Sequence, residues 1–168
     1  MYLFLTRDAK RPRGVLSCKF MDNFEDLLNL SHELGREERG FALLGEGNTS
    51  TRVDENSFAV KASGSNLGSL SREGVAVCRF DKILPLFERE RLSDDETEAA
   101  MLAARVNESE RKPSTEALFH AYLLTLPEVG FVGHTHPVHV NGVLCSPRAR
   151  EYSKRRLFPD QIVCCGTE

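Results

Sequence analysis

The sequence has no excess of basic residues. Lysine and arginine number 22 against 25 acidic residues, which gives a formal net charge of −3. Proteins that bind nucleic acids or anionic membranes usually carry clustered positive charge. We therefore expect no nucleic acid and no membrane among the partners. A small molecule or another protein is the expected partner.

Long hydrophobic runs are missing as well. The apolar run at the start, YLFL, is too short for the core of a signal peptide, and no small-residue cleavage pattern follows it. No other stretch is long enough to span a bilayer. Together these absences favour a cytoplasmic protein.

The cysteines lack the spacing of a CxxC metal site, and their number, five, is odd. We expect them to be reduced and to act mostly as small hydrophobic side chains. A regulatory thiol at the adjacent Cys164 and Cys165 is the alternative. The five are Cys18, Cys78, Cys145, Cys164 and Cys165.

No repeat, linker or low-complexity segment divides the chain, so we predict a single domain over residues 1–168. Hydrophobic periodicity and turn residues delimit its elements. Helices are predicted over residues 21–36, 93–106 and 114–126 and near 138–155. Ser93 and Glu96, three residues apart, form a capping box at the start of the second of these. Strands are predicted at residues 41–45, 57–62, 75–80, 130–136 and 161–165. Strands mixed with helices indicate one layered α/β domain.

Three of the five histidines lie within GFVGHTHPVH, residues 130–139. On an extended segment, His134 and His136 are two residues apart and project from the same face. Two imidazoles are half of a metal site, because zinc and related ions take three or four ligands. His139 follows Pro137 and is expected to enter a helix, away from that face.

Glu116 is the predicted neighbour of this pair. It lies near the start of the helix in PSTEALFHAY, where a carboxylate is favoured by the helix dipole even without a function. This helix leads through a short turn into the strand that carries His134, so Glu116 and His134 are expected at the same end of the two elements. His120, flanked by aromatic residues, is expected to pack nearby rather than to bind metal directly.

Two glycine- and hydroxyl-rich segments, GEGNTST and KASGSN, are suited to binding an anion, because glycine lets backbone amides approach a phosphate. Ser114 and Thr115 at a helix start form a third cluster of donors. Each segment alone is also what an ordinary turn uses.

The ordered motifs GNTS, KASGSN, PSTEALFH and HTHP resemble the class II aldolase and adducin head family, whose members include fuculose and rhamnulose 1-phosphate aldolases. The resemblance extends from the first helix to the final LFPDQIVCCG. It implies a three-layer α/β/α fold, in which a mixed, largely antiparallel β-sheet lies between helices. It also implies a homo-oligomer, since the family's enzymes are commonly tetramers.

The resemblance also implies roles for individual residues. Glu116 corresponds to the catalytic acid/base, which can meet the metal, and His134 and His136 to ligands of a divalent ion, with Zn²⁺ the first choice. The residues implied in binding the substrate phosphate are Asn48, Thr49, Ser63, Gly64, Ser114 and Thr115.

One departure from the family is the third metal histidine, because no histidine follows His139. We therefore expect the chain to be incomplete at its C-terminus, and the 168 residues alone to bind metal weakly and to have little activity. The aldolases' proton-donating tyrosine has no secure counterpart, although Tyr152 lies in a suitable region.

The function that these residues imply is that of a metal-dependent aldolase, a lyase that cleaves a phosphorylated ketose by a retro-aldol reaction through a metal-stabilised enediolate. A sugar-phosphate epimerase or dehydratase would use much the same site and is the first alternative. A non-catalytic assembly module like the adducin head is the second.

Overall fold

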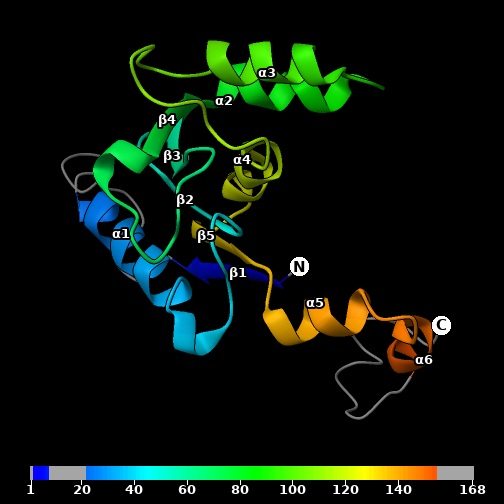
Figure 1. The fold of residues 1–168 in the computed structure, drawn as a ribbon. Helices are drawn as coiled ribbons and strands as arrows, with labels where there is room; N and C mark the ends of the chain where they lie inside the picture. Colours follow the sequence, from blue (N-terminus) through cyan, green and yellow to red (C-terminus); the bar gives the residue numbers. More distant parts are fainter. Residues whose placement is uncertain (1, 8–21, 155–168) are drawn as a thin grey trace.

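The computed structural model describes residues 2–7 and 22–154, which form a five-stranded sheet with helices on both faces (Figure 1). The strands lie in the order β1-β5-β2-β3-β4, and every pairing among them is antiparallel. The strands are β1 (Tyr2–Arg7), β2 (Asn48–Arg52), β3 (Ser57–Lys61), β4 (Val75–Arg79) and β5 (Val129–Thr135). The predicted largely antiparallel sheet is thus confirmed.

Helices cover both faces of this sheet. Helix α1 (Asp22–Leu34) packs on β2 and β5 from one side, whereas α4 (Ala117–Thr125) packs on β5, β2 and β3 from the other (Figure 1). The layer of α4 also contains α2 (Phe80–Ile83) and η3 (Leu84–Glu88), and α3 (Asp94–Ala103) packs on α2. The predicted three-layer α/β/α architecture is confirmed.

The two-residue period of the strands divides the core between the faces. Phe58 and Val60 of β3 belong to the cluster that contains α4, whereas Ala59 between them packs with Leu27 of α1. On β5, Val132 faces the α4 side. The same period carries His134, two residues further on, to the α4 side.

The C-terminal elements extend beyond the sheet. Helix α5 (Val138–Leu144) and helix α6 (Ala149–Ser153) pack on each other, and the Val138 amide is tied to the Gly40 carbonyl over 2.9 Å (Figure 1). They agree with the helical turns expected near 138–155. Two short 3₁₀ helices, η1 (Glu37–Arg39) and η2 (Arg72–Gly74), complete the elements.

Several predicted elements are confirmed. Helix α1 falls within residues 21–36, and β3, β4 and β5 match the predicted strands at 57–62, 75–80 and 130–136. Helix α3 begins with the expected capping box, in which Ser93 Oγ accepts from the Glu96 amide and the Glu96 carboxylate accepts from the Ser93 amide. The strand predicted at 161–165 lies outside the described residues.

The prediction of a strand at residues 41–45 is wrong. The Glu46 amide donates to the Leu43 carbonyl over 3.0 Å and closes a turn, and Leu44 has a φ of 54°, which no extended strand allows. The strand in this part of the chain is β2, which lies further along in the segment NTSTR, where the sequence suggested a turn. Strand β1 was not predicted at all.

The helix predicted to begin at Ser114 begins later, because Glu116 is the N-cap of α4. The preceding segment is held extended: Pro113 forms a β-bridge with Ala62, and the Ser114 amide donates to the Lys61 carbonyl over 3.3 Å. Because this segment is hydrogen-bonded in an extended conformation, the helix begins only after these contacts end.

The two cysteines among the described residues differ in burial. Cys78 is fully buried, and burial raises the pKa of its thiol to about 12, as suits a small hydrophobic side chain. Cys145 is exposed, contrary to the role of small hydrophobic side chain expected for most of the cysteines. Cys18, Cys164 and Cys165 lie outside the described residues. Within the described ranges, no helix has the length and apolar character that crossing a bilayer requires.

Candidate metal centre

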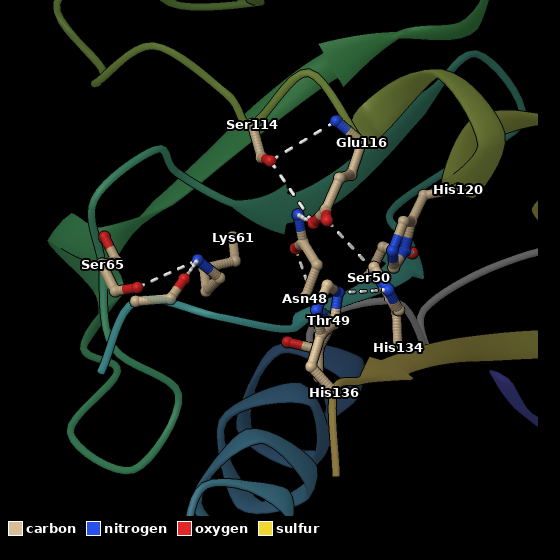
Figure 2. Close-up of polar contacts among 11 residues, drawn as sticks. Asn48, Thr49, Ser50, Lys61, Ser65, Ser114, Glu116, His120, His134 and His136 are labelled. Atoms are coloured by element: carbon tan, nitrogen blue, oxygen red, sulfur yellow. Dashed lines mark hydrogen bonds and ion pairs between the residues drawn. The ribbon is translucent and has the colours of Figure 1, made fainter. Parts of the chain in front are cut away.

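The two histidines of HTHP lie where β5 ends. His134 belongs to the strand and is 2% exposed, and His136 follows the last strand residue and is partly exposed. Their Nε2 atoms are 2.9 Å apart (Figure 2). The extended backbone therefore places both rings on one side, as the spacing predicted.

Glu116 reaches this pair from the start of α4. Its Oε1 atom lies 3.3 Å from His134 Nδ1, and Asn48 Nδ2 donates to its Oε2 atom over 3.1 Å (Figure 2). Ser114 Oγ lies 3.5 Å from the same oxygen. One ligand atom from each of Glu116, His134 and His136 lies within 4.8 Å of the other two.

The donors of this cluster fit a divalent cation. Two imidazoles and a carboxylate form a set that zinc and related ions accept, with room for a further ligand. Among the described residues, the buried His134 Nδ1 has no hydrogen-bond partner of proper geometry, although Glu116 is close. A buried polar atom without a partner is unfavourable, so a ligand that takes up these donors would stabilise the cluster.

The environment keeps the Glu116 carboxylate ionised. Burial raises its pKa, but the contacts with His134 and Asn48 outweigh burial and lower the pKa to about 2. An ionised carboxylate beside two imidazoles can bind a cation or accept a proton.

His120 lies just behind the cluster. It is fully buried on α4, and its Nδ1 atom is 2.7 Å from Ser50 Oγ of β2. Burial, and then the charge of His134, lower its pKa to about 3, although Glu116 acts in the opposite direction. His120 is not one of the three clustered ligand residues, in agreement with the packing role predicted for it.

Other residues that the sequence singled out lie elsewhere. His139 is exposed on α5, and Tyr152 lies on α6, which extends beyond the sheet. The hydroxyl of Thr49 is buried toward α1, where it is 2.7 Å from Ser31 Oγ. The structure therefore brings Asn48 to the cluster but not the side chain of Thr49.

The remaining predicted phosphate-binding residues come from two segments that lie side by side. The Ser63 amide donates to the Lys112 carbonyl over 2.9 Å, which joins the loop at Ser63 and Gly64 to the segment that leads to Ser114 and Thr115. Gly64 has a φ of 72°, a conformation that favours glycine. Ser63, Gly64 and Thr115 are exposed and Ser114 is partly exposed, so a ligand can reach them.

Lys61, the first residue of KASGSN, joins the two predicted anion-binding segments. Its side chain is 2% exposed, and Nζ donates to the Gly45 carbonyl over 3.1 Å and to the Ser65 carbonyl over 2.9 Å (Figure 2). Burial lowers the pKa of this lysine. The signal in the sequence was a lysine within the largely apolar strand SFAVKA, which indicates that its charged group is buried.

The fold and the cluster define a three-layer α/β/α domain with a candidate divalent-metal centre at the end of strand β5. Residues 25–166 match the family described as Class II Aldolase and Adducin N-terminal domain, and the chain belongs to this family.

Two curated relatives are similar in sequence. The 3-oxo-tetronate 4-phosphate decarboxylase of Haemophilus influenzae is 34% identical over 116 residues, which cover 67% of this chain and 44% of the relative. An uncharacterized oxidoreductase of Bacillus subtilis, YuxG, is 28% identical over 156 residues, which cover 88% of this chain and 21% of the relative. The chain therefore spans less than half the length of either relative.

A solved structure shares the fold. The N-terminal class II aldolase domain of a conserved protein from Thermoplasma acidophilum is 26% identical, with a TM-score of 0.65, and the match covers 86% of this chain and 68% of that one.

Proposed function

We propose that this protein is a metal-dependent lyase that cleaves a phosphorylated ketose by a retro-aldol reaction, with Zn²⁺ as the first choice of cation. The observation that carries the proposal is the convergence of Glu116, His134 and His136 at one end of β5. Membership of the class II aldolase family supports it.

Glu116, His134 and His136 would hold the cation through a carboxylate oxygen and two ring nitrogens. A divalent cation bound there supplies a positive charge that stabilises the negative charge developing on the substrate's carbonyl oxygen.

Glu116 also moves a proton in this proposal. Its low pKa keeps it ionised at neutral pH, so in the condensation direction it accepts the proton from the carbon next to the carbonyl. In the cleavage direction the carboxylate takes up the proton that the substrate hydroxyl loses as the carbon bond breaks, and then passes it to that carbon. The hydrogen bond from Asn48 Nδ2 to Glu116 Oε2 holds the carboxylate in place for this transfer.

The substrate phosphate binds at the two joined segments. Ser63, Ser114 and Thr115 supply hydroxyl donors and Gly64 supplies a backbone amide, and Ser114 Oγ lies 3.5 Å from Glu116 Oε2. Binding the remote phosphate orients the reacting end of the substrate, so part of the binding energy lowers the barrier.

The Glu116→Gln variant of the full-length protein tests the proposal. We expect it to lose about a hundredfold or more in cleavage rate, because a neutral amide does not transfer the proton. Zinc content, measured by mass spectrometry of the purified protein, should fall little, since both histidines remain and the amide oxygen of glutamine can still contact the cation. The matched control is Glu55→Gln, which changes an exposed acid in the turn between β2 and β3 and should keep full activity. Unchanged cleavage by Glu116→Gln would exclude the assigned role.

A decarboxylase acting on a phosphorylated keto acid is the second candidate. It is favoured by the 34% identity to the 3-oxo-tetronate 4-phosphate decarboxylase. Loss of carbon dioxide from a keto acid leaves negative charge next to a carbonyl group, as retro-aldol cleavage does, so the same cluster serves both reactions. Incubation with a panel of ketose phosphates and phosphorylated keto acids, with identification of the products, separates the two and also detects epimerase or dehydratase activity.

An assembly role without catalysis is the remaining alternative, and metal analysis addresses it. Full-length protein purified at neutral pH without a bound divalent metal would favour assembly over catalysis.

We further propose that the protein works in the cytoplasm as a homo-oligomer. Support for association comes from apolar side chains at the surface, which include Phe87 (52% exposed), Tyr122 (53% exposed) and Leu144 (55% exposed). Sedimentation of the full-length protein tests this, and a monomer at micromolar concentration would contradict it.

A further inference from the structure

The side chain of Arg111 lies across the Ser63–Ser65 loop. Its Nη1 atom donates to Ser65 Oγ over 3.0 Å, and its Nη2 atom donates to the Ser63 carbonyl over 2.9 Å. Arg111 belongs to the segment that leads to α4, so one guanidinium joins that segment to both ends of the loop. The contact fixes the loop relative to Ser114.

The guanidinium also lies beside the turn of the loop. A Cβ atom built on Gly64 would be 3.5 Å from Arg111 Nη2. Both Gly64 and Arg111 are exposed, so a ligand that reaches the glycine also reaches the guanidinium.

Two positively charged side chains, those of Lys61 and Arg111, contact Ser65, and they differ in the number of hydrogen-bond donors left for a ligand. Lys61 is buried and its ammonium donates to two backbone carbonyls. Arg111 is exposed, and its planar group carries further N–H donors that its two contacts do not use. Such a planar fork suits the oxygens of a phosphate better than a lysine ammonium does.

We propose that Arg111 is a substrate-binding residue of this site: it holds the Ser63–Ser65 loop and donates its remaining N–H groups to the phosphate of the substrate. This inference rests on the proposed function, because it assumes that the loop receives a phosphate. Arg111 would thus be a positively charged phosphate-binding residue that lies outside the motifs of the predicted ones.

Isothermal titration of inorganic phosphate into the full-length, metal-loaded protein tests the inference. Loss of charge-assisted hydrogen bonds should weaken phosphate binding by about tenfold or more in Arg111→Gln. Arg111→Lys should recover part of the affinity, because it keeps the charge but not the fork. The matched control is Arg79→Gln, which changes an exposed arginine of β4 that is paired with Asp81 of α2 and should bind phosphate as the wild type does.

Kinetics distinguish binding from a merely structural role. In Arg111→Gln the KM for a phosphorylated ketose should rise about tenfold with little change in kcat, whereas turnover of the same sugar without phosphate should not change. A structural role would reduce turnover of both substrates alike, and that result would overturn the inference.

The remaining outcomes separate this inference from the proposed function. If Arg111→Gln binds phosphate as tightly as the wild type while Ser114→Ala binds it more weakly, the phosphate site stands and the role of Arg111 is wrong. If the wild type neither binds phosphate nor acts on phosphorylated ketoses, the proposed function fails and the inference fails with it.

Discussion

Asn48 Nδ2 donates a hydrogen bond to Glu116 Oε2 over 3.1 Å, and this contact ties the first residue of β2 to the residue that starts α4. The register of the sheet explains it, because Asn48 is paired with His134 across β2 and β5. The carboxylate is therefore positioned by the same two strands that position the histidine.

Replacing Asn48 by alanine should reduce kcat/KM by about tenfold to a hundredfold, since hydrogen bonds to charged groups contribute roughly 1.5–3 kcal/mol. Steady-state kinetics of the full-length protein measure the effect. Asn48→Asp should be worse than Asn48→Ala, because it places a second carboxylate beside Glu116. Equal activity of the two variants would contradict this electrostatic account.

Removing the hydroxyl of Thr49 should affect stability and not the site. Thr49→Val loses the buried contact with Ser31, at a cost of about 1 kcal/mol in the free energy of unfolding, measured by urea denaturation. Thr51→Val is the matched control, because it loses a comparable bond to the Gly130 carbonyl. Weaker phosphate binding in Thr49→Val alone would restore the role that sequence analysis gave this hydroxyl.

Zinc should stabilise the full-length protein through His136. A ligand at 100 times its dissociation constant raises the free energy of unfolding by about 2.7 kcal/mol. Thermal denaturation with and without zinc should show the gain in the wild type and in His139→Ala, whose changed residue is exposed on α5. His136→Ala should lose the gain. An equal zinc effect in both variants would place the cation elsewhere.

His120 should make the fold sensitive to acid. Its pKa is lowered from 6.5 to about 3, so between these values the unfolded chain binds a proton that the native chain does not. The contribution of His120 to the free energy of unfolding is fully present above pH 6.5. Below that value it falls by about 1.4 kcal/mol for each pH unit. His120→Asn should therefore show a shallower decline between pH 6 and about 5, a window above the range of Glu116. An unchanged slope would assign the acid sensitivity to another group.

Two glycines should respond in opposite ways to alanine. A Cβ atom on Gly35 would lie 2.1 Å from the Gly68 amide nitrogen, so Gly35→Ala should destabilise by about 1–3 kcal/mol or more. A Cβ atom on Gly142 in α5 meets nothing within 4 Å, and Gly142→Ala should stabilise by about 0.5–1 kcal/mol. Urea denaturation of both variants measures the difference. A stable Gly35→Ala protein would show that the two backbones can separate.

The sequence predicted those features that depend on local pattern. The spacing of His134 and His136 determines that both rings share a face, and the pair Ser93 and Glu96 marks the start of α3 through contacts made within one turn. The position of Glu116 beside His134 followed from the short turn between helix and strand.

What the sequence did not predict depends on distant partners. Strand β2 consists of polar residues of the kind found in turns. It can be buried because Ser50 hydrogen-bonds with His120 and Thr49 with Ser31. Nothing near Arg111 in the sequence indicates that it reaches Ser63, which lies 48 positions earlier. Such pairings become visible only once the sheet has brought the segments together.

The two histidines differ in what holds them. His134 lies in the paired part of β5, whereas the pairing ends at Thr135, so His136 belongs to the connection that leads to α5. A cation that joins the two rings would therefore link the rigid sheet to the start of α5. The orientation of the C-terminal helices and the occupancy of the metal centre would then depend on each other, and a change in either would be felt by the other.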